Sequence, residues 1–352
     1  MLSDNQRLYD ISIRLALYVE RVKYWQVAKF NHVLKNIKTV LRELFSRINY
    51  NTLDGLSKAK LNKLLIDLRK SQTTIYSEYI QDLIKDLQLF MQANLIINRQ
   101  VWTSVNAQQD KNNTFENNIV FSDEEAIKYI EKKKKNPLFG LAVVTGNDDR
   151  LWSSILNSPS PANGLYLIPF LKTFQNSAQA SVENIIRKGW ANNASVDDVL
   201  TELIGSGQLS QSATSQIKKI QNQNSAVINT SMADISQLVS AAVASSVFEK
   251  YAWYSVIDNR TTWICISRNL KVYYYGKGPV PPAHVNCRST IGPVQTENDT
   301  IDENFYDWFD RQPEEIQNEF SEDFDKKTKK FVTKEPLTFE EFKGKIKTIL
   351  IN

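Results

Sequence analysis

Proline and glycine are nearly absent from the first third of this 352-residue sequence. The first proline is Pro137, and Gly55 is the only glycine before Gly140. Because these two residue types are the strongest interrupters of helices, their scarcity predicts long helices up to about residue 136. Cysteine and histidine are also rare, with two of each in the whole chain. Two cysteines exclude a stabilising disulfide framework.

Long hydrophobic runs are missing as well. No stretch approaches the roughly 18 apolar residues that a membrane-spanning helix requires, and the contents of 42% hydrophobic and 23% charged residues are typical of soluble globular proteins. The first six residues, Met1 to Gln6, lack the basic start and apolar run of a secretory signal. We therefore expect a protein that is made and works in a reducing cytoplasm and has no membrane partner.

Charge of one sign does not dominate the chain, since the net charge is only +4. This balance is too small to predict a nucleic-acid-binding protein, because phosphate affinity depends on clustered positive charge. The distribution is more informative. Residues 1–136 hold 22 Lys and Arg against 15 Asp and Glu, whereas residues 297–325 hold 12 acidic residues and a single base, Arg311.

The N-terminal region has the pattern of a helical hairpin. Ser3 to Gln6 fit a capping box, and apolar residues then recur every three or four positions from Leu8 to Ile48. Turn-forming residues occupy positions 49–55, and a second helical pattern covers positions 58–102. We expect two helices that fold back on each other and bury their apolar stripes between them. A partner-binding role of this hairpin would come in addition to that packing.

The middle of the sequence predicts further helices. One pattern runs from Leu165 to Gly189, which suits a left-handed C-cap, and Ser195 suits the N-cap of a helix that ends before Gly205. After a polar stretch at positions 206–225, an amphipathic helix is expected at positions 228–248. The run Lys132, Lys133, Lys134 and Lys135 closes a short helix, where it forms a solvated face or contacts DNA phosphates.

The residue pattern changes from that of helices to that of short strands and turns at residues 253–294. Strand-forming residues occur at positions 255–257 and 271–275, and a constrained loop rich in glycine and proline follows. Both cysteines, Cys265 and Cys287, and one of the two histidines, His284, lie in this segment. The other histidine, His32, falls on the first helix and is expected at its surface.

This segment resembles the phage Mu F-like, or head-morphogenesis, family of minor capsid proteins. The family pattern runs approximately Asp-x-Arg-Thr, Cys, a strand containing Gly-Lys, then Pro-Pro-x-His-x-Asn-Cys-Arg. Eleven identities in order over about thirty positions is a specific signal. The matching residues are Asp258, Arg260, Thr261, Cys265, Lys271, Pro281, Pro282, His284, Asn286, Cys287 and Arg288.

The resemblance has two departures. Many family members carry further cysteines where this chain has Thr262 and Ser289. The remaining Cys265, His284 and Cys287 favour a buried knot without a cofactor, in which the cysteines pack as small apolar residues and His284 hydrogen-bonds the backbone. Asp258 and Arg260 would form an ion pair that caps the loop. The alternative is a Zn²⁺ site, for which the motif offers only Asp258 as the fourth ligand.

The resemblance implies a structural protein and not an enzyme. It implies a minor head protein of a tailed bacteriophage, located in the virion at the head interior or portal vertex and in the host cytoplasm during assembly. The implied partners are the portal protein, the major capsid or scaffolding protein, and packaged double-stranded DNA. The alternative from another class is a zinc-dependent nucleic-acid-binding or nuclease protein that uses Asp258, Cys265, His284 and Cys287.

The last segment interleaves acids with aromatic residues. We expect its aromatic side chains to pack on the rest of the chain, with docking onto a basic partner surface as the alternative. A short helix is expected from Pro336 onwards. The sequence thus predicts a mainly α protein with four segments: a helical hairpin (1–136), a helical middle (137–252), a small α+β module (253–296) and an acidic-aromatic tail (297–352).

Overall fold

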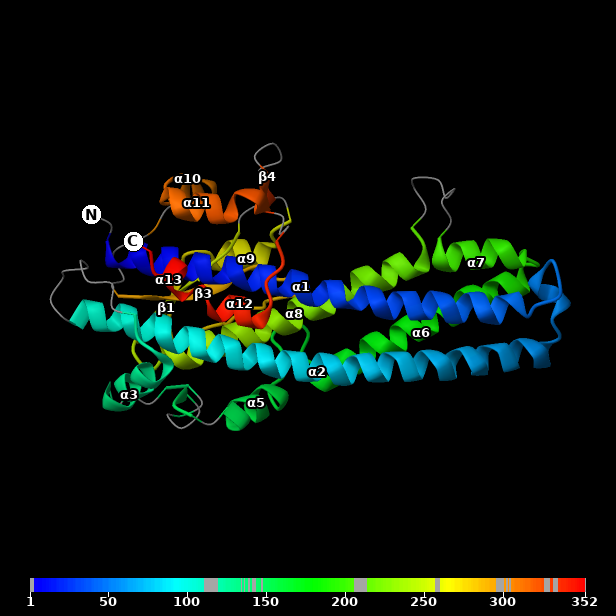
Figure 1. Cartoon of the computed structure of the whole chain (residues 1–352), viewed down its shortest axis with the longest axis horizontal. Coiled ribbons are helices and arrows are strands. Elements are labelled where there is room, and N and C mark those ends of the chain that lie inside the picture. The colour runs from blue at the N-terminus through cyan, green and yellow to red at the C-terminus, as the bar shows by residue number, and fades with distance from the viewer. Residues whose placement is uncertain are drawn as a thin grey trace. The chain divides into compact units, whose positions relative to one another are not determined.

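The computed structural model shows a mainly α-helical protein with a small antiparallel sheet in its C-terminal region (Figure 1). This confirms the predicted fold class. The structure describes residues 3–110, 120–133, 135, 137–138, 140, 144–146, 148–205, 214–256, 260–295, 301, 303, 305–325, 330–331 and 335–351. The chain forms two compact units: unit 1 holds residues 1–25, 87–167 and 229–352, and unit 2 holds residues 26–86 and 168–228.

The two longest helices are those that the scarcity of proline and glycine predicted. They are α1 (Asp4–Ser46) and α2 (Lys58–Asp110), joined by a turn that contains η1 (Leu53–Gly55). Ser3 caps α1, because its Oγ accepts a hydrogen bond from the Gln6 backbone N–H at 3.2 Å. The reciprocal half of the expected capping box differs, since the Gln6 amide donates to Glu303.

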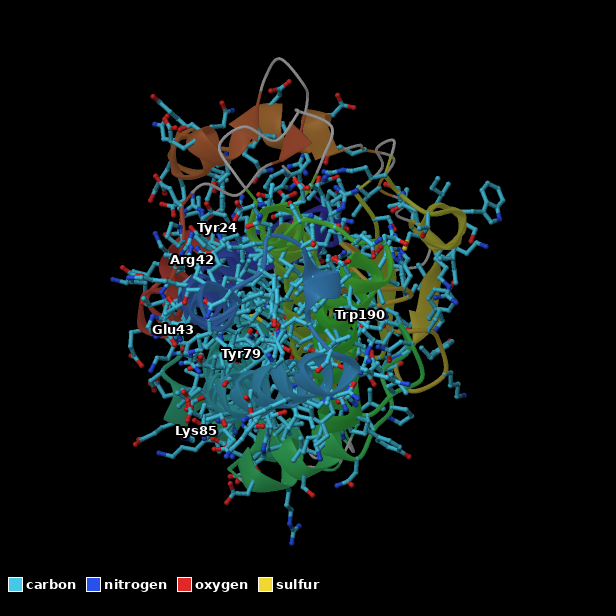
Figure 2. The ribbon with its side chains drawn as sticks, turned by 90° about the vertical axis from the view of Figure 1, so that its right-hand side faces the viewer. Tyr24, Arg42, Glu43, Tyr79, Lys85 and Trp190 are labelled. Carbon is cyan, nitrogen blue, oxygen red and sulfur yellow. The ribbon has the colours of Figure 1, made fainter. Side chains whose placement is uncertain are left out.

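Unit 2 contains the turn of the predicted hairpin. Within it, the α1 side chains Gln26 and Lys29 both donate to Asp86 of α2, and Phe30 packs against Tyr79, which Figure 2 labels. The Tyr79 hydroxyl donates to Asn224 at 2.9 Å. Unit 2 is completed by α7 (Val196–Ile204), by nearly all of α6 (Leu167–Ala191) and by the start of α8 (Gln216–Ala244).

Two expectations for this region were wrong in detail. Gly189 is not a left-handed C-cap but lies inside α6, where a Cβ would come within 2.4 Å of Val199, so the glycine permits close packing of α6 and α7. The left-handed residue beyond the helix is Asn193, at φ 54°. The polar stretch before residue 225 is partly helical, since α8 begins at Gln216 and buries apolar side chains there. Ser195 does cap α7, as predicted.

Unit 1 contains the small sheet, whose strands have the order β2-β1-β3 and are antiparallel. The strands are β1 (Lys250–Tyr254), β2 (Val272–Tyr274) and β3 (Thr290–Val294). The strand expected at 255–257 is wrong, because β1 ends at Tyr254 and residue 257 lies outside the described residues. The helices α3 (Asp123–Lys133), α5 (Asp148–Leu156) and α9 (Trp263–Arg268) also belong to this unit.

The acidic-aromatic tail packs on the N-terminal part of α1 inside unit 1 (Figure 1). It forms α10 (Phe305–Asp310), α11 (Glu314–Phe320), η2 (Ser321–Asp323), the strand pair β4 (Phe324–Asp325) and β5 (Lys330–Phe331), then α12 (Phe339–Lys343) and α13 (Ile346–Ile349). Trp308, Phe309 and Phe320 are buried, as expected for aromatic packing on the chain itself.

The tail also neutralises charges that α1 buries. Arg21 is 1% exposed and lies 2.6 Å from the carboxylate of Asp323, which is fully buried, and 2.9 Å from Glu319. Arg14 donates to the Gln312 side chain, and Arg311 pairs with Asp10. Since a buried charge is costly unless it is paired and hydrogen-bonded, these contacts fix the tail on α1.

Within the described residues, none of the helices combines the length and the apolar content that crossing a membrane requires.

A substitution at Gly292 tests the close approach of α1 to the sheet. A Cβ at this position would lie 1.9 Å from the Ser12 hydroxyl oxygen of α1. We expect Gly292→Ala to destabilise unit 1 by about 1–3 kcal/mol through overpacking, measured as a lower midpoint of thermal unfolding by circular dichroism. Gly344→Ala is the control, because its Cβ would have no neighbour closer than 3.3 Å. Equal midpoints for the two variants would contradict the packing.

The ion pair between Arg21 and Asp323 gives a second test. We expect Arg21→Ala to lower the free energy of unfolding by about 3–5 kcal/mol, because it leaves the buried Asp323 carboxylate with less compensation. Urea unfolding measures the change. Lys85→Ala is the control, since Lys85 and Asp82 are both 74% exposed and such a pair contributes under about 1 kcal/mol. A loss no larger than that of the control would show that the tail does not hold α1 in this way.

Candidate functional site

The residues of the motif that can bind a metal converge on one point of unit 1. The Cys265 sulfur lies 3.3 Å from Nε2 of His284 and 3.7 Å from the Cys287 sulfur. The three candidate ligand atoms all lie within 4.8 Å of one another. Both cysteines are buried and His284 is half-buried. The sequence predicted this convergence, and among the described residues it is the one cluster of three or more such side chains with that geometry.

Local backbone structure positions each of the three side chains. Cys265 lies in the first turn of α9, which begins after Thr262. His284 and Cys287 lie on the loop before β3, where the Cys287 N–H donates to the His284 carbonyl at 3.1 Å. Asn286 between them has a φ of 60°, which asparagine tolerates better than most residues, and its N–H donates to Thr230 of α8. The loop is therefore fixed to a helix.

Hydrogen bonds fix the orientation of the His284 imidazole and shift the pKa values of the two thiols in opposite directions. Nδ1 of His284 lies 2.9 Å from the Val285 carbonyl, so Nδ1 carries the proton and Nε2 turns its lone pair towards the sulfurs. The hydrogen bond from the Cys265 thiol, together with the N–H groups of Ser289 and Ala283, lowers the pKa of Cys287 against the effect of burial. The same bond, with burial, raises the pKa of Cys265. Of the two thiols, Cys287 is thus the one that loses its proton more readily.

The two positions at which the chain departs from the family pattern border this cluster. The side chains of Thr262 and Ser289 both act to lower the pKa of the Cys265 thiol, and Ser289 also acts to lower that of Cys287. The Ser289 hydroxyl lies 3.0 Å from that of Ser255. The structure thus places an oxygen where a further cysteine would supply sulfur.

Two of the three separations between the ligand atoms are close to those around a tetrahedral ion. Two sulfurs at about 2.3 Å from such an ion are about 3.8 Å apart, and a sulfur and a nitrogen are slightly closer. The separations from the Cys265 sulfur, 3.7 and 3.3 Å, are near these values, and all three ligand atoms lie within 4.8 Å of one another. The cluster can therefore hold a metal ion with three protein ligands. The fourth position would be taken by a weaker oxygen ligand such as Ser289 or water.

The cysteines also belong to the hydrophobic core of the module. Cys265 and Cys287 pack in one buried cluster with Tyr251, Trp253 and Ile291. Tyr251 and Trp253 come from the central strand β1, so the two thiols join α9 and the loop to the sheet. The arrangement cross-links these elements through packing, whether or not an ion is bound.

The space beside the cluster is very small. A hollow of about 20 Å³, lined by Cys265, His284, Arg260 and Arg288 among others, is large enough for about one water molecule. A nucleotide or a peptide does not fit inside this hollow.

The other predicted motif residues have structural places. Thr261 donates to the Val256 carbonyl, Pro282 is buried after a cis peptide bond with Pro281, and Lys271 donates its N–H to Arg268 at 3.0 Å. Asp258, the predicted fourth ligand and ion-pair partner of Arg260, lies outside the described residues.

The lysine run that was considered for DNA contact is partly occupied within unit 1. Lys133 lies over the ring of Tyr129, at 5.2 Å from its centroid. Lys135 donates to the Val247 carbonyl at 3.4 Å and lies 3.9 Å from Glu249. Lys132 is exposed in the last turn of α3, and Lys134 lies outside the described residues. His32 is exposed beside Asn36, far from any cysteine in sequence.

Sequence reasoning missed an exposed apolar edge next to the cluster. Trp263 is 79% exposed at the start of α9, and Ile266 and Val285 are about 40% exposed. Trp263 directly follows Thr262, a position at which the chain departs from the family pattern, and this neighbourhood was the one available signal. The exposure of an apolar residue in a short helix leaves no periodic pattern in the sequence.

Comparisons of the chain with protein-family models, with curated proteins and with solved structures gave no match.

A substitution at Ser289 tests the metal site. We expect Ser289→Cys to increase the affinity for Co²⁺ at least tenfold, because it supplies a third thiolate and a fourth strong ligand. Titration of the reduced protein, followed by the thiolate-to-cobalt absorption band, measures the affinity. Ser267→Cys is the matched control, since it adds a thiol to α9 outside the cluster. If both variants bind cobalt like the unmodified chain, the ligand geometry is wrong.

Proposed function

We propose that this chain is a minor head protein of a tailed bacteriophage, of the Mu F-like head-morphogenesis type, with a structural and not a catalytic role. The observation that carries the proposal is the convergence of Cys265, His284 and Cys287, with Thr262 and Ser289 beside them, in one cluster whose cysteines are buried. These are the positions that the family pattern singles out. Their proximity gives the resemblance a physical basis.

The geometry of the cluster favours scaffolding over chemistry. Its thiols are part of a hydrophobic core, its histidine is held by a backbone carbonyl, and its hollow accommodates about one water molecule. A catalytic cysteine or metal must be reached by its substrate. A nuclease that uses these residues would need a much larger opening.

We further propose that the ion held by the cluster is Zn²⁺, in a structural role. Thiolate and imidazole ligands suit zinc, and the lowered pKa of Cys287 favours binding because the ligands must be deprotonated. Cys265, His284 and Cys287 would hold the ion, which would supply a further cross-link between α9 and the loop. The same cluster without an ion would be the buried knot, with the same structural purpose but a weaker cross-link.

The partner that we propose is the portal or a neighbouring head protein, and the exposed apolar edge is the surface that suits it. Trp263, Ile266 and Val285 project from the elements that the cluster joins. Tryptophan is the residue type most often found at the energetic centre of interfaces. The tail is less suitable, because its buried aromatic residues and several of its carboxylates already pack on α1.

The decisive experiment asks whether purified virions contain the chain. We expect the protein in tailed-phage heads and expect Trp263→Ser to reduce its incorporation at least tenfold, measured by quantitative mass spectrometry of purified particles. Leu89→Ser is the control, since Leu89 is an exposed apolar residue outside the motif segment. Absence of the protein from virions would contradict the proposal.

The catalytic alternative is tested on the purified protein. We expect no cleavage of DNA in the presence of Zn²⁺, and a lower unfolding midpoint for Cys287→Ser and His284→Ala. Cleavage that both substitutions abolish would assign the cluster to a nuclease.

A further inference from the structure

Positive charge gathers in unit 2, in a place that the motif does not involve. Unit 2 contains 16 Lys and Arg against 10 Asp and Glu, a net charge of +6, whereas the whole chain carries only +4. Unit 1 therefore has a slight negative excess. An excess of this kind matters for binding only if the cations lie together.

They lie together in a groove between α1 and the start of α8, within unit 2. The α1/α8 groove has a volume of about 450 Å³ and is lined by Asn31, Leu34, Lys35, Lys38 and Arg42 of α1 and by Ser215, Ile217, Lys218 and Gln221. Four of these side chains are cationic. Among the described residues that line the groove, none is acidic and none is aromatic.

The cations are not neutralised by the chain itself. Lys35, Lys38, Arg42 and Lys218 form no ion pair with any residue that the structure describes, whereas Lys29, six residues before Lys35 on α1, pairs with Asp86. Lys218 donates to Gln221, and Gln221 donates to Asn31, so neutral polar groups hold the two sides of the groove together. The positive potential of the groove is therefore open to an external anion.

The row on α1 has the dimensions of a stretch of nucleic-acid backbone. Lys35, Lys38 and Arg42 are three and four residues apart on one helical face and span about 10 Å at 1.5 Å per residue. Arg42, at the end of this row, is labelled in Figure 2. The opposite side adds Lys218 in the first turn of α8, a 29-residue helix whose N-terminal N–H groups also favour anions.

We infer that the α1/α8 groove binds the phosphate backbone of double-stranded DNA. Clustered cations without acids select a polyanion, and the absence of an aromatic platform disfavours single strands, whose bases need stacking partners. The two amide side chains of the groove, Gln221 and Asn31, hydrogen-bond each other, and cations contact phosphates whatever the bases, so we expect binding that is independent of sequence. This inference deepens the proposed function by naming the groove that contacts DNA, in place of the lysine run at 132–135.

The test is the salt dependence of DNA binding by the full chain. Fluorescence anisotropy with a labelled 30-base-pair duplex between 50 and 300 mM NaCl gives the dissociation constant at each salt concentration. We expect Lys38→Gln/Arg42→Gln/Lys218→Gln to weaken binding at least thirtyfold at 50 mM NaCl. We also expect the plot of log affinity against log salt concentration to become less steep. Its negative slope should shrink in magnitude by about 2.7, since each phosphate contact contributes about 0.9.

The matched control is Lys63→Gln/Lys70→Gln/Lys172→Gln. It removes the same charge from exposed positions of unit 2 outside the groove, and we expect less than a threefold effect. Equal losses in the two triple variants would overturn the inference. Tighter binding of a 30-residue oligothymidine, or stronger competition by polyglutamate than by duplex, would overturn it too.

The outcome is distinguishable from that of the proposed function. Incorporation into virions is measured in parallel, and we expect the groove variant to enter heads normally. Loss of DNA binding in a variant that still assembles supports both proposals. Absence of the unmodified chain from virions contradicts the proposed function alone, and normal DNA binding by the groove variant contradicts the inference alone.

Discussion

The structure depends above all on how the first helix satisfies the charges that it buries. Asp10, Arg14 and Arg21 lie on faces of α1 that are closed off from solvent, and each finds its partner in the tail, about 300 residues later. Because an unpaired buried charge costs several kcal/mol, α1 can occupy the middle of unit 1 only with the tail in place. The sheet is held by the same helix, through the close approach of Ser12 to Gly292. The Cys/His module rests on that sheet.

Much of the helical fold could be predicted from the sequence, and the reason is local. Capping at Ser3 and Ser195, the turn at positions 49–55 and the apolar periodicity of α1 and α2 are all encoded within a few residues of where they act. The burial of Arg21 could not be predicted, because arginine beside an apolar stripe is ordinarily exposed unless it is paired, and its partners lie about 300 positions later in the chain. The position of β1 was missed for a related reason. Its sequence continues the apolar pattern of the preceding helix, and only pairing with β2 and β3 makes it a strand.

The candidate site divides in the same way. The three candidate ligands could be predicted from the motif, because cysteine and histidine are rare in this chain and three of the four lie within 23 positions. It did not give the size of the hollow beside them, which follows from side-chain packing alone. The basic groove was also hidden, because Lys218 and the row on α1 are almost 180 positions apart. The sequence instead drew attention to consecutive lysines, two of which are partly engaged with their own surroundings.

The position of the tail in the chain has a consequence for folding during synthesis. Helix α1 is synthesised before the tail, and its ionic partners there lie between residues 311 and 335. At about 5–20 residues per second, the two are separated by roughly 15–60 s of translation. During that interval the charged groups of α1 remain hydrated and unit 1 stays open, while the segments of unit 2 are already complete by residue 228. Nascent chains of this protein therefore mature in a fixed order, from the hairpin turn to the terminus.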